Sequence, residues 1–382
     1  MLSKYFQGNK QLIVLEVANN HQGDLEHALK IIKLFSEINN KYIDDFNFAF
    51  KFQYRDLETF IHKDYKNSDI KYVRRFLDTQ LNDKEWSSLI NAVKDAGFYT
   101  MCTPFDEASV NKVVQDNFDI LKIASASIDD WPLIEKIGDS NKKEIIASIG
   151  GASMEKVKRF FSYMNNKGKD IALNYCVSLY PTSQDKLNIS YVKELKRTFP
   201  NIPVGFSTHE NGSVDNTAGL ALAAGAVIFE KHVALENNNK NYTINDYSVD
   251  PKQYENWICN LLESKTTLGS VENRNFNLNL ELDALRDLKR GIFVNKDLSK
   301  NKLDNKDVYF AIPSKQNQLL SNDLSKFNDI ELESDIKIDQ PVLYNQVNIS
   351  NTRPEVEKIR DFIRDELRHY NISIPQSIDL EI

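Results

Sequence analysis

The chain has 382 residues, of which 41% are hydrophobic and 10% aromatic, enough for a sizeable core and two or three domains. Its 48 basic and 55 acidic side chains leave a formal charge of −7, which argues against nucleic-acid or anionic-membrane binding. We expect a cytoplasmic protein without a disulfide framework or zinc knuckle. The three cysteines lack CxxC spacing, residues 1–11 hold no apolar leader, and no run reaches the roughly 18 apolar residues of a membrane span.

Short β-rich runs alternate with longer amphipathic runs over the first 265 residues. The expected strands, in chain order, are 12–18, 48–53, 98–104, 120–125, 144–149, 172–178, 203–208 and 227–233. Helical patterns lie between them, and another follows at 250–265. Nearly continuous apolar strands separated by helices indicate a covered parallel sheet, and no strand is followed by a GxGxxG turn. We therefore predict a closed (β/α)₈ TIM barrel over residues 1–265.

Polar residues end every predicted strand, and barrel active sites are built at the carboxyl ends of strands. The candidates are Glu16, Lys51, Gln53, Thr103, Lys122, Ser125, Ser148, Ser178, Tyr180, Ser207, His209 and His232. A lysine inside an apolar strand needs an anion nearby, because an unpaired buried charge costs several kcal/mol. That anion could be a structural partner such as Glu230. Two lysines together with several hydroxyls instead favour a site for a phosphate.

Two of these candidates, His209 and His232, are one βα unit apart. They are therefore expected at the ends of adjacent strands, which run about 4.8 Å apart. Two imidazoles at that separation can share a divalent metal and leave its other positions to water and substrate, as in catalytic sites. A histidine at a strand end can equally be a hydrogen-bonded structural residue.

A series of motifs now carries a resemblance to a known family. The motifs are "LEVANNHQGD", "FKFQ", "CTPFD", "LKIASAS", "CVSLYP", "GFSTHENG" and "EKHV". They resemble, in order, those of the sialic acid synthases, which make nonulosonic acids from phosphoenolpyruvate (PEP) and an aldose. Residues 285–349 are similar to the small antifreeze-like SAF domain that follows the barrel in that family. We expect 266–284 to be a linker, and 350–382 to be a helical arm or the start of a further domain.

The resemblance implies roles for the strand-end residues. His209 and His232 would bind Mn²⁺ or Mg²⁺, which would polarise the aldehyde that PEP C3 attacks. Glu16 and Tyr180 would be catalytic. The residues expected to bind substrate are Lys51, Gln53, Thr103, Lys122, Ser125, Ser148, Ser178, Ser207 and Asp246. In the resembled family the SAF domain covers the barrel mouth of the other subunit, so the resemblance also implies a domain-swapped homodimer.

The chain departs from the family pattern on the side that faces the sugar. Ser127 stands at an acidic position of the family, and Ile312 replaces an arginine that recognises an N-acyl group. Asp246, displaced by one or two positions, is expected to substitute for an aspartate of the family. These departures predict an unusual acceptor. Two alternatives stay open: a metal-dependent pyruvate aldolase or lyase, and a non-catalytic sugar-binding relative. The sequence does not identify the aldose, the preferred metal, the oligomeric state or the role of residues 350–382.

Overall fold

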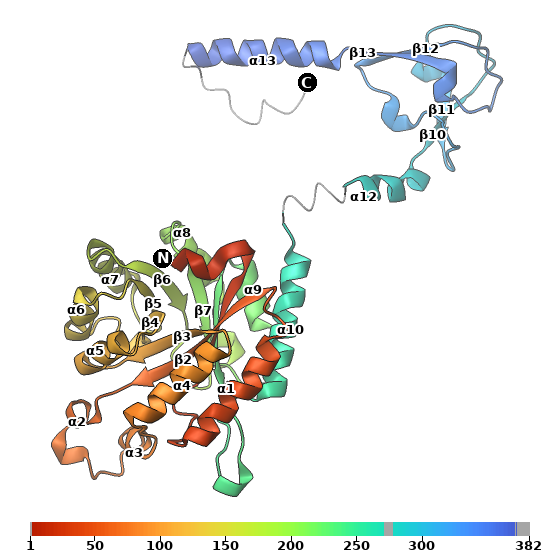
Figure 1. The fold of residues 1–382 in the computed structure, drawn as a ribbon. Coiled ribbons are helices and arrows are strands. Elements are labelled where there is room, and N and C mark those ends of the chain that lie inside the picture. Colours follow the sequence, from red (N-terminus) through yellow and green to blue (C-terminus); the bar gives the residue numbers. More distant parts are fainter. Residues whose placement is uncertain (1, 271–277, 371, 373–382) are drawn as a thin grey trace. The chain divides into compact units, whose positions relative to one another are not determined.

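The computed structural model describes residues 2–270, 278–370 and 372. The chain divides into two compact units, Met1–Gly269 and Ser270–Ile382 (Figure 1). The division lies inside the segment 266–284 that the sequence suggests as a linker. Helices α10 and α12 occupy parts of that segment, ending at Leu268 and beginning at Leu278 respectively. Residues 271–277 of the expected linker lie outside the described part of the chain.

The first unit is built on eight parallel strands that close into a ring. They are β1 (Gln11–Glu16), β2 (Phe46–Tyr54), β3 (Tyr99–Pro104), β4 (Ile120–Ile123), β5 (Glu144–Ser148), β6 (Asp170–Tyr175), β7 (Val204–Thr208) and β8 (Ile228–Val233). Each strand pairs with the next one, and β8 pairs with β1. A short strand, β9 (Ser248–Val249), pairs in parallel with the end of β8. The predicted TIM barrel is confirmed.

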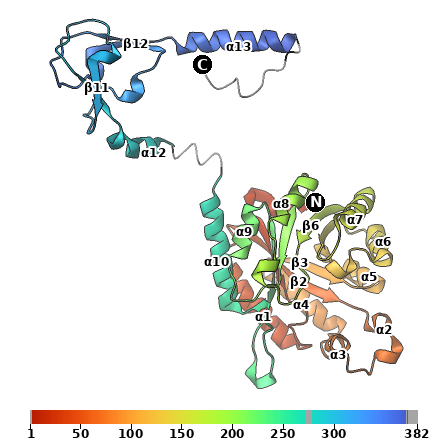
Figure 2. The same cartoon turned by 180° about the vertical axis from the view of Figure 1, so that it is seen from behind.

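Helices surround this ring in both views (Figure 1, Figure 2). They are α1 (Leu25–Asn39), α2 (Leu57–Phe60), α3 (Lys71–Asp78), α4 (Asp83–Asp95), α5 (Glu107–Gln115), α6 (Trp131–Asp139), α7 (Met154–Asn166), α8 (Tyr191–Thr198), α9 (Thr217–Ala223) and α10 (Pro251–Leu268). Side-chain caps start several of them, with full capping boxes at Asn82 and Asp250. Among the described residues, no helix combines the length and apolar character needed to cross a bilayer.

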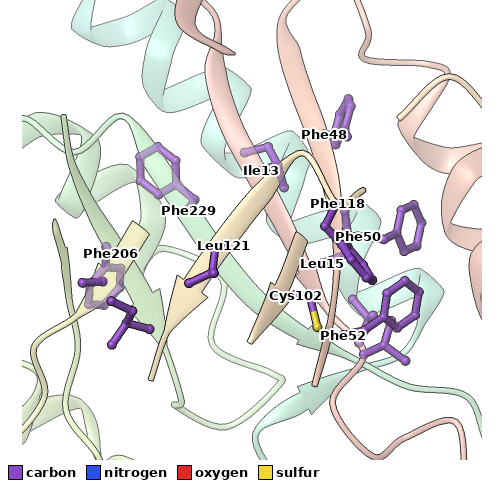
Figure 3. Close-up of a cluster of buried hydrophobic side chains, with 14 of the residues drawn as sticks. Ile13, Leu15, Phe48, Phe50, Phe52, Cys102, Phe118, Leu121, Phe206 and Phe229 are labelled. Carbon is purple, nitrogen blue, oxygen red and sulfur yellow. The ribbon is translucent and has the colours of Figure 1, made fainter. Parts of the chain in front are cut away.

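Alternate residues of each strand face opposite sides of the barrel wall, as the two-residue period of a strand requires. One set packs outward beneath the helices and includes Phe48, Phe50, Phe206 and Phe229 (Figure 3). The other set fills the barrel interior. Its apolar members are Leu12, Val14, Ala49, Met101, Ile120, Ile146, Ala172 and Ile228, together with Leu2 and Tyr5 from an N-terminal 3₁₀ segment. A packed apolar layer therefore forms the floor for the side chains nearer the carboxyl ends of the strands.

The second unit is a small β-rich body with its own core. It contains α12 (Leu278–Leu285), β10 (Gly291–Val294), β11 (Val308–Ala311), β12 (Asn328–Leu332), β13 (Val347–Asn351) and α13 (Arg353–His369). Strands β10 and β11 form one antiparallel pair, and β12 and β13 form another. Its core is formed by Ile292, Val294, Leu303, Val308, Leu319, Ile330, Leu332, Ile336 and Val342. The side chain of Ile312, just after β11, is exposed.

Candidate active site

A layer of polar side chains lies directly above the apolar interior of the barrel. It continues the inward-facing alternation, so each strand supplies one member: Glu16, Lys51, Thr103, Lys122, Ser148, Asn174, Ser207 and Glu230. All eight are buried. Burying four charged groups in one layer is tolerated only when they are paired with one another or with a ligand.

Glu230 on β8 is the centre of this charge cluster. Its Oε1 accepts hydrogen bonds from Lys51 Nζ at 2.7 Å and from Ser207 Oγ at 2.9 Å, while its Oε2 lies 3.5 Å from Lys122 Nζ. Lys51 also contacts the carboxylate of Glu16. Lys122 donates to Ser148 Oγ at 2.6 Å. The structural ion pair considered from the sequence therefore exists, and both lysines share one carboxylate.

The environment gives the two carboxyl groups different proton affinities. Burial raises the pKa of Glu16 above its usual range, and the attraction of Lys51 offsets this only in part. Burial also acts to raise the pKa of Glu230, but Lys122 and Lys51 outweigh it, so that pKa lies well below its usual range. Glu230 is thus the ionised partner of the lysines. Glu16 is the group better able to carry a proton, and such divergent pairs are typical of acid and base roles.

Several polar atoms in the layer have no partner within the described residues. The Thr103 hydroxyl and both side-chain polar atoms of Asn174 are buried without a hydrogen bond. An unsatisfied buried polar group costs roughly 1–3 kcal/mol, and each such group in a folded protein calls for an explanation. A polar ligand held in the barrel mouth would supply the missing partners.

A cradle of small side chains lies around Gly150, just after β5. The Ser125 hydroxyl accepts a hydrogen bond from the Gly150 amide at 3.0 Å and lies 3.1 Å from Cys176 Sγ. A Cβ on Gly150 would come within 2.2 Å of Ser178 Oγ and 2.9 Å of Ser125 Oγ. Strands β4 and β6 end earlier than predicted, so both serines lie beyond the strands. Only a glycine at this position lets the two hydroxyls approach one another.

The two candidate metal ligands lie next to each other at the mouth. The ring centroids of His209 and His232 are 5.5 Å apart. The Nδ1 of His209 donates to the Val177 carbonyl oxygen at 3.0 Å, which leaves its Nε2 lone pair free. Burial lowers the pKa of His209 to about 4 and that of His232 well below its usual value, so both rings are neutral at pH 7. Neutral imidazole is the form that binds metals.

These two histidines fit an open metal site. Among residues 2–270, 278–370 and 372, no group of three or more His, Cys, Asp or Glu side chains is placed to hold an ion. Two protein ligands would leave most coordination positions to water and substrate, which suits catalysis. The carbonyl that fixes His209 is the kind of outer partner that orients a metal-binding imidazole.

The remaining predicted residues lie around the rim. Tyr180 is 54% exposed, and its ring centroid lies 4.4 Å from that of His209. Gln53 faces the mouth from β2 and accepts a hydrogen bond from Arg55 at 3.0 Å. Asp246 has an exposed side chain, and its backbone carbonyl accepts from the Gly212 amide at 2.8 Å. Ser127 is buried in the 3₁₀ turn after β4.

Two members of the polar layer were not among the predicted site residues. The sequence-based prediction gives Glu230 only a structural role and does not include Asn174. Both follow from the strand alternation: Glu230 shares the inward face of β8 with His232, and Asn174 pairs in register with Ser148. The two-residue period could have identified them from the sequence.

Comparison with known proteins identifies the family of this chain. A model of the NeuB family matches residues 48–273, more than half of the chain. The chain belongs to the NeuB family. The match begins within β2 and continues past β8, so it includes both lysines, both histidines and Glu230.

Individual NeuB-family relatives extend the similarity. The N,N'-diacetyllegionaminic acid synthase of Campylobacter jejuni is 28% identical over 304 residues, which cover 74% of this chain and 87% of that protein. A solved Chromobacterium violaceum structure, described as spore coat polysaccharide biosynthesis protein E, matches with a TM-score of 0.82 and 37% identity over 89% of this chain and all of that one. The sialic acid synthetase of Leptospira borgpetersenii matches with a TM-score of 0.60 and 26% identity over 72% of this chain and 93% of that one.

Proposed function

We propose that this NeuB-family chain is a nonulosonic acid synthase, which condenses PEP with an aldose and releases phosphate. The observation that carries the proposal is the buried pair of lysines, Lys51 and Lys122, which share Glu230 below two neutral histidines. The names of relatives, such as diacetyllegionaminic acid synthase and sialic acid synthetase, support the same reaction class.

The lysines and the hydroxyl groups would bind PEP. Burial lowers the pKa of Lys122, whereas Lys51 has a raised pKa because Glu16 and Glu230 outweigh the effect of its burial. Binding of a phosphate would raise the pKa of Lys122 again, because a nearby anion favours the charged amine. Thr103, Ser125, Ser148, Ser178 and Ser207 would donate hydrogen bonds to the phosphate and carboxylate oxygens. The same cations would stabilise phosphate as it leaves.

The proton and carbonyl chemistry would take place on the other side of the mouth. A divalent ion held by His209 and His232, Mn²⁺ or Mg²⁺, would supply Lewis-acid polarisation of the aldehyde when bound. Glu16, with its raised pKa, would hold the proton that is exchanged with water or a sugar hydroxyl. Tyr180 and Gln53 would orient the sugar, and Asp246 would contact it from the loop before β9.

We also propose that the enzyme has little preference for N-acetylmannosamine over other aldoses, and that residues 285–349 form an SAF-like domain in a homodimer. Ile312 has no hydrogen-bond donor on its side chain, and Ser127 has no carboxylate. A site discriminates strongly against an analogue only when its own buried polar groups would lose their partners. Without those groups, the penalty for a sugar that lacks the N-acyl group should be small.

The decisive experiment measures phosphate release by the full chain with PEP, a divalent metal and a panel of aldoses. We expect release only when all three are present, with little preference for N-acetylmannosamine over 2,4-diacetamido or non-acylated aldoses. The solution mass of the same preparation should equal that of a dimer. Pyruvate release from a sugar acid without PEP would instead establish an aldolase, and strong selectivity for N-acetylmannosamine would contradict the acceptor proposal.

Replacing Gly150 with alanine should damage PEP binding and leave the fold intact. The new Cβ would displace the Ser125 and Ser178 hydroxyls, and the loss of two hydrogen bonds predicts an increase in the KM for PEP of about tenfold. Steady-state kinetics on Gly150→Ala measure this change, and Mn²⁺ affinity serves as the internal control because His209 and His232 are untouched. An unchanged KM for PEP would show that the cradle does not hold this substrate.

A further inference from the structure

Arg55, just after β2, has its guanidinium over two aromatic rings. The guanidinium carbon lies 4.0 Å from the ring centroid of Phe76 on α3 and 3.7 Å from that of Phe105, which follows β3. A guanidinium stacked on aromatic rings keeps its N–H donors along its edge. One donor reaches Gln53 Oε1 at 3.0 Å, while the Nε–H is buried and has no hydrogen-bond partner among the described residues.

No carboxylate in the described part of the chain lies within 4.0 Å of this guanidinium. The nearby acidic groups have other partners. Asp106 caps α5 and accepts the Asp56 amide, Asp83 pairs with Lys112 at 2.7 Å, and Glu58 pairs with Lys66. Burial lowers the pKa of Arg55 to about 10, so it still carries its charge at pH 7. A half-buried cation without an ion pair is costly unless a ligand supplies the anion.

The position of Arg55 indicates which ligand it meets. It lines a cavity of about 300 Å³ together with Gln53 and with Asn19 and His21 from the loop after β1. This cavity extends from the carboxyl ends of β1 and β2 toward α4 and α5, and its lining also includes Asp56, Glu58, Asp83 and Lys112. In the ring order the hydroxyl cradle belongs to β4–β6, on the opposite side. Gln53, which is proposed to orient the aldose, accepts a hydrogen bond from Arg55, so the aldose is the substrate expected beside the guanidinium. Lys51, earlier on the same strand, is the group expected to contact PEP.

We propose that Arg55 is a specificity-determining residue that binds an anionic substituent, a carboxylate or a phosphate ester, on the acceptor aldose. The edge of a guanidinium matches two oxygens of such a group in one plane, and the two phenyl rings hold it in that orientation. The aromatic contacts also leave it less hydrated than a free arginine, which strengthens a charge-assisted hydrogen bond. This inference rests on the proposed function for the presence of an aldose in the mouth.

Equilibrium binding tests the proposal independently of turnover. Calorimetry on the full chain with Mn²⁺ would compare mannose, mannose 6-phosphate and mannuronate as probes. We expect at least one anionic sugar to bind about tenfold or more tightly than mannose, the effect of one charge-assisted hydrogen bond. Arg55→Met should reduce that advantage to about twofold or less, and Arg55→Lys should retain part of it because the charge remains but the planar fork is lost. Arg159→Met, which removes an exposed arginine on α7, is the matched control and should change nothing.

Other results would overturn the assignment. If neither anionic sugar bound more tightly than mannose, or if the advantage persisted in Arg55→Met, Arg55 would not recognise an anionic acceptor. A higher KM for PEP in Arg55→Met, with sugar binding unchanged, would show that the arginine binds PEP instead. Failure of PEP consumption with every aldose would contradict the proposed function, while the binding comparison would still decide the role of Arg55.

Discussion

His209→Ala and His232→Ala should each reduce turnover by about 100-fold or more while the protein stays folded. Loss of an outer-shell partner alone typically costs 10- to 100-fold in metal affinity or activity, so the loss of one of two direct ligands should cost more. Both rings lie at strand ends, and each is neutral because burial lowers its pKa. The measurement is kcat at saturating PEP and aldose over a Mn²⁺ titration, with melting temperature as the check on folding.

His62→Ala provides the matched control for the histidine variants. Its side chain is 64% exposed, outside the barrel, and its removal should leave activity and Mn²⁺ dependence unchanged. Full activity of either mouth variant with added Mn²⁺ would refute the metal assignment. Loss of activity with a large fall in melting temperature would mean instead that the histidine is structural.

Lys122→Met and Lys51→Met should weaken the binding of PEP far more than the binding of the aldose. The expected loss of PEP binding free energy is roughly 2–5 kcal/mol. Each variant removes a buried cation from a site expected to hold a phosphate. Lys122→Met is the cleaner test, because Glu230 keeps its contact with Lys51 at 2.7 Å. Lys51→Met leaves Glu16 without its cation and should also reduce stability. Titration of PEP and of aldose against each folded variant measures the two affinities separately.

Lys231→Met is the control for removing a buried lysine as such. Lys231 lies on the same strand as Glu230 but faces outward, where its ammonium is 3.1 Å from Glu210. Its loss should destabilise the fold without a selective effect on PEP. Equal loss of PEP and aldose affinity in the Lys122 variant would show that the lysine has another role.

The barrel could be predicted from the sequence because its strands are apolar at almost every position. Runs such as Phe46–Tyr54 present one face to the helices and the other to the interior, so the pattern indicates burial on both sides. The connection between β2 and β3 was harder to predict. Helix α3 has no buried residue, and without an apolar face periodicity gives little signal.

The site was partly predictable for the same reason. Residues on strands, such as Lys51, Lys122 and His232, have an orientation fixed by the strand period and lie together as expected. Residues beyond the strand ends have no orientation fixed by that period, even where they lie beside a predicted partner, as His209 does. The role proposed for Arg55 depends on Phe76 and Phe105, which come from separate elements, and no local pattern relates them.

The closed ring also affects how the protein is made. Lys51 and Glu230, which pair in the barrel, are 179 residues apart in sequence, and β1 receives β8 only when the ring closes. During synthesis, Lys51 and Lys122 are therefore made well before β8, the strand that carries their counter-ion Glu230. Neither amine can be buried beside that carboxylate until β8 has been added. Such long-range closure slows folding and leaves open sheet edges exposed during synthesis. Burial of the lysines and assembly of the active site should consequently occur in one late step, and chains released before β8 should be targets for chaperones and proteases.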